Sequence, residues 1–388
     1  MTDTPLDRIS RLKHPMSNAS FPVLTLNGDA YQRGLTHGAQ AVDKIRAGTE
    51  HYCRMWERNT DRSRGELVEL AGGFGPVVAD FDAEIFREME GIAAGAQVPL
   101  ADVLLLNARY EIMVAAFFGG GGVAGAARGE CTSFAAQPDA TRDGHTYVAQ
   151  NWDLTPETGE RSVLLEIIQK DRPNIVTHCE AGFVGHKGMN SAGLGICVNS
   201  IGCQHDRFTN KVPVFVLART VLNSATIDEA ERALLRAERT ASVNITIGSD
   251  VGQVAALEVT PVDVARIDPV ASRVAHANVL CGVHPSRGLT DTLAQTFPVF
   301  RERSERAREL IDGVVVSVDT LQQLFRDREN VPEAICRHVD DQPPGVPEGL
   351  CMETVVSMIM DLTERTIWMT DGPPDRSEYV RYSFDSLR

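Results

Sequence analysis

The chain has 388 residues, and its 43% hydrophobic and 23% charged content is ordinary for a globular protein with a large core. A net charge of −15 argues against nucleic-acid and anionic-membrane partners, because phosphates would be repelled. No apolar run reaches the roughly 20 residues of a spanning helix, and the N-terminus lacks the pattern of a signal peptide. We therefore expect a cytoplasmic protein.

The N-terminal third is predicted to be mainly helical. Residues 21–26 alternate as a short strand, and apolar residues at helical spacing over 35–56 predict one amphipathic helix. Asp82 is placed to cap a second helix. Residues 118–129 are rich in glycine, which favours an exposed linker suited to a chain break, although an ordinary glycine-rich loop remains the alternative.

Beyond this linker the pattern changes to strands. An Asp143-Gly144 turn joins the first two strands as an antiparallel hairpin. Two helices follow the first group of strands, and Thr226 opens a capping box for the second. Later helices are expected at 297–312 and 318–327, which fits sheets with helices packed outside. Strands are expected at 132–137, 145–151, 162–169, 175–180, 193–199, 242–248, 254–260, 352–362 and 366–370.

The motifs with candidate catalytic residues begin where the linker ends. Cys131-Thr132-Ser133 opens the first strand of the hairpin, and Asn151-Trp152-Asp153 closes the second. If the chain breaks before Cys131, that cysteine gains a free α-amine with a reference pKa near 8, which can deprotonate its own thiol. The pattern therefore predicts self-cleavage between Glu130 and Cys131. An unreactive core cysteine is the alternative.

These motifs resemble the isopenicillin N acyltransferase-like family of N-terminal-nucleophile (Ntn) hydrolases. The resemblance implies an α+β fold, a four-layer αββα sandwich with an N-terminal helical segment. It also implies that residues 1–130 form an α-segment that stays bound as a heterodimer partner, while 131–388 form the catalytic part. The family often has Gly where this chain has Glu130. Further similar segments are Gly28–Gly34, His37-Gly38, Glu90–Ala96, Leu106-Asn107, Glu111, Gly188–Leu194 and Ser242–Asn244.

Three residues are the candidate catalytic set. Cys131 would be the nucleophile and form a thioester. The resemblance assigns Asp153 to the active site, where its carboxylate could hold the α-ammonium; a turn-capping role is the alternative. Asn244 matches an active-site Asn of the family, and its amide could donate to an oxyanion. A polar residue on a solvated strand face is the alternative for Asn244.

Other residues are weaker candidates. Arg303 lies among several arginines of one predicted helix, and the spacing does not single it out, so it is not in the catalytic set. His276 and Asn278 are interpreted as a hydrogen-bonded structural pair. No metal site or cofactor is predicted, because the histidines are dispersed and no Cys-x-x-Cys occurs. Asn151, Phe183, Met189 and Asn190 are candidate substrate-binding residues, with ordinary strand packing as the alternative.

We interpret the chain as a self-processing enzyme that hydrolyses the amide of a small N-acyl compound. The alternative within the same chemistry is acyl transfer from an acyl-CoA or an amide to an amine such as a β-lactam nucleus. A non-catalytic binding protein of the same fold and an ordinary Cys-His protease are the rival classes. The acyl group, the amine and any homo-oligomeric state stay open.

Overall fold

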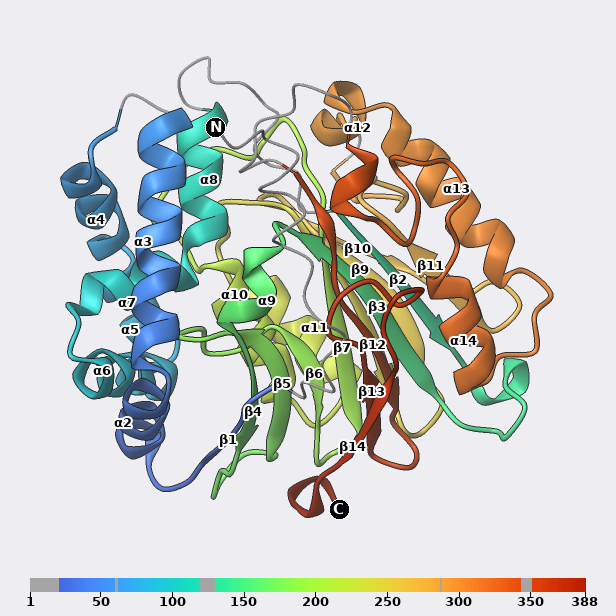
Figure 1. Ribbon diagram of the computed structural model, residues 1–388, viewed down its shortest axis with the longest axis horizontal. Helices are drawn as coiled ribbons and strands as arrows, with labels where there is room; N and C mark the ends of the chain where they lie inside the picture. Colours follow the sequence, from blue (N-terminus) through green and yellow to red (C-terminus); the bar gives the residue numbers. More distant parts are fainter. Residues whose placement is uncertain (1–20, 60–61, 119–129, 287, 343–350) are drawn as a thin grey trace, which may run out of the picture.

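Two β-sheets lie face to face at the centre of the molecule (Figure 1). The computed structural model describes residues 21–59, 62–118, 130–286, 288–342 and 351–388. The first sheet has eight strands: β1 (Val23–Leu26), β4 (Ser162–Ile167), β5 (Ile175–Glu180), β6 (Lys187–Asn190), β7 (Leu194–Ser200), β8 (Val243–Ser249), β9 (Val254–Val259) and β10 (Val264–Ile267). The second has six: β11 (Arg273–His276), β2 (Glu130–Ala136), β3 (Tyr147–Leu154), β12 (Glu353–Asp361), β13 (Thr366–Met369) and β14 (Val380–Ser383).

Helices cover the outer face of each sheet. Two helices, α13 (Val299–Ile311) and α14 (Val318–Phe325), pack on the six-stranded sheet. Short helices α9 (Glu157–Arg161) and α12 (Thr292–Thr296) lie in connections. The eight-stranded sheet shares its core with α3 (Val42–Asn59), α4 (Arg64–Gly72), α5 (Gly75–Phe81), α6 (Ala83–Ala96), α7 (Leu100–Asn107), α8 (Arg109–Phe118), α10 (Val214–Leu222) and α11 (Ile227–Arg236). The order helix, sheet, sheet, helix confirms the predicted α+β class and its four layers.

The single helix predicted over 35–56 is wrong, because the chain forms two helices that meet at Ala41. Helix α2 (Ala30–Gln40) ends there, and α3 starts at the next residue. Helix α2 packs backbone to backbone against α6, where a Cβ on Gly34 would lie only 2.0 Å from the Glu88 carbonyl oxygen. Helix α3 packs mainly on α7. Two different packing partners therefore fix two helix directions within one continuous apolar pattern.

The predicted hairpin of β2 and β3 is antiparallel, with Cys131 opposite Trp152 and Glu130 opposite Asp153. The connection is longer than a two-residue turn: β2 ends at Ala136, a 3-10 turn covers Pro138–Ala140, and β3 begins at Tyr147. Gly144 lies in this connection with a φ of 75°. The hairpin therefore brings the two predicted motifs together although its turn is larger than expected.

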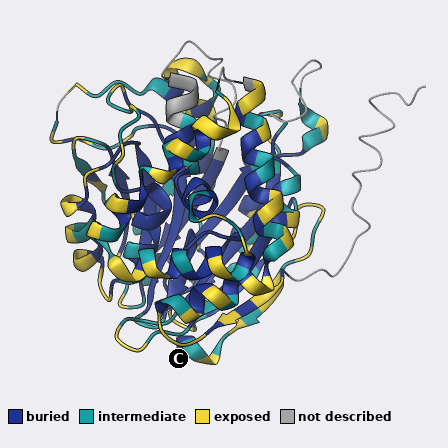
Figure 2. Ribbon diagram, turned by 90° about the vertical axis from the view of Figure 1, so that its left-hand side faces the viewer, coloured by how far each residue is buried: buried dark blue, intermediate teal, exposed yellow. Residues whose placement is uncertain are grey.

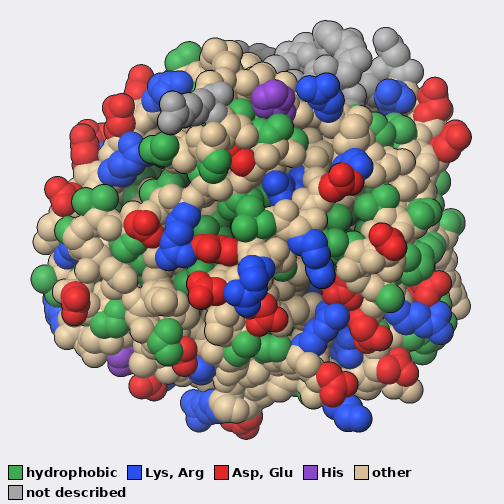
Figure 3. All heavy atoms as spheres, turned by 180° about the vertical axis from the view of Figure 1, so that it is seen from behind, with side chains coloured by type: hydrophobic (Ala, Val, Ile, Leu, Met, Phe, Trp, Pro, Cys, Tyr) green, Lys and Arg blue, Asp and Glu red, His purple; other side chains and the backbone are tan. Residues whose placement is uncertain are grey.

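The other predicted strands are present, with ends shifted by a few residues. Figure 2 shows that the central strands are buried while exposed residues gather on the outer faces of the helices, and the edge strands β1, β10 and β14 are partly exposed. The face in Figure 3 carries interspersed acidic and basic side chains. Within the described residues, no helix combines the length and hydrophobicity needed to cross a membrane. Most of the predicted linker at 118–129 lies outside the described residues.

Candidate active site

Cys131 lies near the start of β2, and its buried side chain lines a cavity between the sheets and the N-terminal helices. The inner strands that contribute to the cavity come from both sheets, so the site exists only once the sandwich has formed. Much of the wall is apolar. Its other lining residues include Tyr52 and Met55 of α3, Tyr110 and Met113 of α8, Phe215 of α10, Trp152, Val198, Val243 and Met352, with His51, Arg109, His186 and Ser200 as polar groups.

The Cys131 thiol is protonated in the intact chain at neutral pH. Burial and, to a smaller extent, the nearby Asp153 carboxylate raise its pKa to about 12, against the opposing effects of the Asp153 backbone N–H and of the Lys187 and Arg303 cations. A thiol in this state is a poor nucleophile. Attack on a carbonyl therefore requires a base that removes the proton.

Two residues outside the predicted catalytic set hold the Cys131 backbone. The Cys131 N–H donates to Asn278 Oδ1 over 2.9 Å, and Arg303 Nη1 donates to the Cys131 carbonyl oxygen over 2.9 Å. Arg303 Nη2 also donates to Asn278 Oδ1 over 2.7 Å, so each of the three residues is hydrogen-bonded to the other two. The amide of Asn278 in turn donates to the Ser200 carbonyl oxygen over 2.7 Å. Both groups therefore fix the position of the nucleophile.

Neither residue belongs to the catalytic set that the sequence predicts. The helical spacing of arginines in α13 does not say which one faces inward. The structure resolves this, because Arg303 is 1% exposed whereas Arg301 and Arg308 are exposed. For Asn278, the signal in the sequence is the His276-Ala277-Asn278 motif. The Asn278 side chain contacts the Cys131 backbone rather than only a structural neighbour.

Asp153 lies inside β3, so it does not cap a turn. Its side chain is fully buried, and Thr354 Oγ1 donates to Oδ1 over 2.7 Å. The other carboxylate oxygen, Oδ2, is buried and receives no hydrogen bond from the described residues. Burial raises the pKa of this carboxyl to about 7, against the opposing effect of the Arg303 cation. Asp153 therefore offers an open acceptor next to the nucleophile's strand.

Asn244 lies on β8 in a fully buried polar cluster between the two sheets. Its amide donates to Thr246 Oγ1 over 3.1 Å and to Asn199 Oδ1 over 3.3 Å. Ser133 Oγ, two residues along β2 from Cys131, contacts the same two partners over 2.8 and 2.9 Å. The polar face of β8 is therefore turned toward β2 rather than toward solvent.

The four predicted substrate-binding residues are not part of the cavity wall. The Asn151 amide donates to the carbonyl oxygens of Phe325 and Ile335 on the outer side of its sheet. The Asn190 amide donates to two carbonyl oxygens at the end of α10. Phe183 packs against Phe215, and Met189 lies in the core between the sheets. These contacts support packing roles for all four residues.

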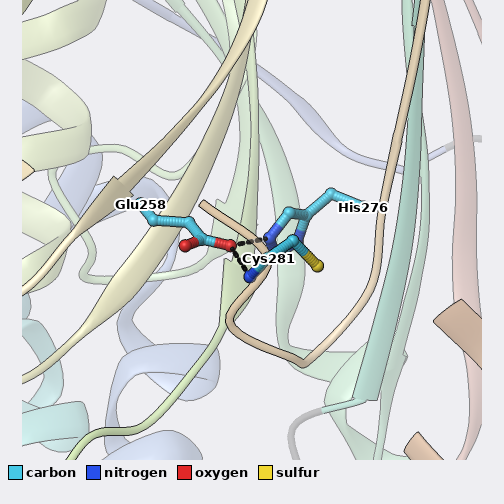
Figure 4. A group of neighbouring side chains, drawn as sticks. All are labelled: Glu258, His276 and Cys281. Atoms are coloured by element: carbon cyan, nitrogen blue, oxygen red, sulfur yellow. Dashed lines mark hydrogen bonds and ion pairs between the residues drawn. The ribbon is translucent and has the colours of Figure 1, made fainter. Parts of the chain in front are cut away.

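Three groups of His, Cys and acidic side chains in the described part of the chain are close enough to hold a metal ion. The group in Figure 4 joins Glu258, His276 and Cys281. Its carboxylate oxygens contact His276 Nε2 over 2.9 Å and the Cys281 N–H over 2.7 Å. His284 Nε2 and the Gly282 N–H also contact this carboxylate. Glu258 thus has a full set of hydrogen-bond donors and ties the loop after β11 to β9. The other two groups are Cys336, His338 and Asp375, and Asp143, His145 and Asp361.

A protein-family model matches more than half of the chain. The family model described as "Acyl-coenzyme A:6-aminopenicillanic acid acyl-transferase" matches residues 140–376, which include Asp153, Asn244, Asn278 and Arg303 and begin after Cys131. The acyl-coenzyme A:6-aminopenicillanic-acid-acyltransferase 40 kDa form of Emericella nidulans is 26% identical over 358 residues, 92% of this chain and 94% of that protein.

The solved structures that are similar to the chain include two hydrolytic enzymes. Conjugated bile acid hydrolase from Clostridium perfringens, in a mutant form, has 12% identity and a TM-score of 0.41, and the match covers 66% of this chain and 97% of that one. Penicillin V acylase from Agrobacterium tumefaciens has 15% identity and a TM-score of 0.38, and the match covers 62% of this chain and 83% of that one.

Proposed function

The chain belongs to the acyl-coenzyme A:6-aminopenicillanic acid acyl-transferase family, and from this membership we propose that it is a self-processing enzyme that breaks the amide bond of a small N-acyl compound through a thioester on Cys131. The observation that carries the proposal is the position of Cys131. Its thiol lines a largely apolar cavity, while Asn278 and Arg303 hold its backbone N–H and carbonyl.

Self-cleavage would convert the precursor into two pieces, 1–130 and 131–388. The Cys131 thiolate attacks the Glu130 carbonyl carbon, the C–N bond breaks, and the nitrogen takes up a proton to become the α-amine. Water then hydrolyses the Glu130 thioester and restores the thiol. The helices before Cys131 share a core with the eight-stranded sheet, which supports a cleaved α-segment that stays bound as a heterodimer partner.

In the processed enzyme the α-amine would take the thiol proton, and the thiolate would attack the substrate carbonyl. The open Oδ2 of Asp153 supports a role in holding the new α-ammonium, because a buried carboxylate oxygen without a donor is costly. The buried amide of Asn244 supports a role as a donor to the oxyanion, although in the intact chain it bonds its own neighbours. Substrate acylates the sulfur and releases the amine.

Hydrolysis is the first proposal, because water can reach an acyl-enzyme without a second binding site. Acyl transfer to an amine, such as a β-lactam nucleus, is the second, and the acyltransferase activity for which the Emericella nidulans relative is named favours it. The apolar cavity wall suits an apolar acyl group in either case. A cytoplasmic location is also proposed, supported by the buried thiols of Cys53, Cys179 and Cys197, which form no disulfide with the described residues and are of the kind that persist where thiols stay reduced.

The test combines mass spectrometry with a substrate panel. Purified protein should contain two chains, the larger beginning at Cys131, and should release amine from N-acyl amino acids or β-lactams. Adding an acyl-CoA and a free β-lactam nucleus separates transfer from hydrolysis, because only transfer forms a new amide. Active protein that remains one intact chain would overturn the self-processing mechanism, and cleaved protein that is inert toward the panel would favour a binding role.

A further inference from the structure

Lys187 is a buried cation for which the mechanism above has no use. It begins β6, its side chain is 0% exposed, and Nζ lies 3.5 Å from the centroid of the Trp152 ring. Its hydrogen-bond partner is His186 Nδ1 at 3.3 Å. Among the described residues no carboxylate lies within ion-pair distance of Nζ. A lysine buried in this way is uncommon, because the ammonium loses hydration without gaining a counter-ion.

The position of Lys187 relates it to the nucleophile. Trp152, whose ring faces Nζ, is the cross-strand partner of Cys131 in the hairpin. Cys131 and Trp152 belong to one buried cluster between the sheets, and His186 lines the same cavity as Cys131. The eight-stranded sheet therefore presents an amine to the strand pair that carries the thiol in the six-stranded sheet.

The intact precursor needs a base that it does not obtain from Cys131. Before cleavage the Cys131 nitrogen is an amide that donates to Asn278, so it cannot accept the thiol proton. The neighbouring histidines are weak bases here, because burial and the Lys187 charge hold the pKa values of His178 and His186 well below the usual range. Burial lowers the pKa of Lys187 to about 7, so a substantial neutral fraction exists at physiological pH.

We propose that the Lys187 amine is the proton acceptor that starts self-cleavage at Cys131. This role rests on the proposed function. The neutral amine takes the thiol proton and gives an ammonium and a thiolate. The thiolate forms its bond to the Glu130 carbonyl carbon, the C–N bond to Cys131 breaks, and the ammonium returns its proton to the departing nitrogen. Because no hydrogen bond joins Nζ to the sulfur in this geometry, the flexible lysine side chain must turn from His186 toward Cys131 first.

The alternative is that Lys187 only packs against the Trp152 ring and takes no part in proton transfer. The two cases differ in their pH dependence. The titratable groups that act on Lys187 are Cys131 on β2, Cys179 and Glu180 on β5, and Cys197 on β7. His178 lies opposite Lys187 on β5, and His186 precedes it. The pKa of Asp153 is also about 7 and its carboxylate acts on the Cys131 thiol, so a rise in cleavage rate centred near pH 7 is assigned to Lys187 only when replacing Lys187 removes that rise.

The test follows cleavage of full-length precursor made in a cell-free system and sampled by mass spectrometry between pH 5.5 and 9. Wild type should cleave with a rate that rises around pH 7. Lys187→Met keeps the length of the side chain and removes the amine, and it should slow cleavage at least tenfold at pH 7.5 and abolish that rise. Lys170→Met, at an exposed lysine, is the matched control and should cleave like wild type.

Folding is checked separately by thermal unfolding, where Lys187→Met should match or exceed wild type because it removes a buried charge. Lys187→Gln provides a second variant should the first misfold. If wild type does not cleave at all, the proposed function fails. If wild type cleaves and a folded Lys187 variant cleaves at the same rate with the same pH profile, only this inference is overturned. A wild-type rate that is flat between pH 6 and 8.5 also overturns it.

Discussion

Arg303 and Cys131 are joined by a hydrogen bond of 2.9 Å from Nη1 to the carbonyl oxygen, although 172 residues separate them in sequence. The same guanidinium donates to Asn278, which accepts the Cys131 N–H. One buried cation thus holds the backbone of the nucleophile and the group that binds its nitrogen. The arrangement positions the peptide unit that must be cut and the nitrogen that must become the base.

Arg303→Lys should leave the chain folded but lower the rates of self-cleavage and turnover by about 10²-fold. A lysine ammonium cannot replace the planar guanidinium, which donates to the Cys131 carbonyl oxygen and to Asn278 at the same time. The free energy of unfolding should fall by about 1–3 kcal/mol, since Asn278 loses a charged donor. Arg301→Lys, on the exposed side of the same helix, is the control. Wild-type rates in Arg303→Lys would show that the guanidinium only fills space.

Cys131→Ala should remain an intact, folded and inactive chain, because both self-cleavage and turnover need the sulfur. Cys131→Ser could still cleave slowly but should acylate poorly, since an alkoxide is harder to form than a thiolate. Intact mass and amine release measure the two steps independently. Turnover by Cys131→Ala would remove the central claim.

Glu130→Gly should speed processing if the larger residue before the nucleophile slows the acyl shift. The measurement is the half-life of newly made precursor, with Cys131→Ala as the uncleaved reference. A half-life that does not change would mean that residue 130 does not limit the reaction.

Asn244→Ala should lower kcat by about 10² or more, since a lost donor to an oxyanion typically costs that much. A control comes from Asn190, whose amide bonds the end of α10 away from the cavity. Asn190→Ala should reduce thermal stability and leave kcat nearly unchanged. A fall of less than about threefold for Asn244→Ala would mean that this amide only ties the two sheets together.

Asp153→Asn should reduce turnover strongly and change its pH dependence. A nearby anion raises the pKa of an α-amine, so removing it should lower that pKa and move the acid limb of the pH–rate profile to lower pH. Glu353→Gln, at the same end of the contact between β3 and β12 and next to Thr354, the cross-strand partner of Asp153, tests whether any carboxyl in the region has this effect. An acid limb that moves to higher pH, or stays in place while activity survives, would assign Asp153 a structural role.

The same substitution should change stability in a pH-dependent way. Burial raises the pKa of Asp153 from 3.8 to about 7, so the folded chain binds the proton more tightly than the unfolded chain. This contribution is complete below about pH 4 and is lost as the pH rises through 7. Asp153→Asn cannot ionise, so on a Cys131→Ala background its stability relative to the parent should increase between pH 4 and 7, by up to about 4 kcal/mol. Denaturant unfolding at both pH values measures the difference, which should be absent for the exposed Asp139→Asn.

The local features of this protein can be predicted from short stretches of its amino-acid sequence. Strand alternation predicts that Asn244 lies on one face of its strand and that Val243 and Ile245 lie on the other. In the structure, Asn244 faces the other sheet, and Val243 and Ile245 face the helices. Asp82 caps α6, and Thr226 accepts the Glu229 N–H at the start of α11 as predicted, although the Glu229 carboxylate accepts the Ala225 N–H instead of closing the box. Such features depend on residues only a few positions apart, so their periodicity and spacing are readable in the chain.

The distant side chains that meet Cys131 could not be predicted from the sequence, because the packing of the folded chain brings them together. Helical spacing could not select Arg303 from its neighbours, and nothing local distinguished Lys187 from a surface lysine. The amphipathic spacing continues through Ala41 and so does not predict the break there, because packing against α6 and α7 sets the directions of the two helices. These outcomes depend on how two sheets and two helical layers stack, and contacts between segments far apart in sequence leave no periodic signal in either segment.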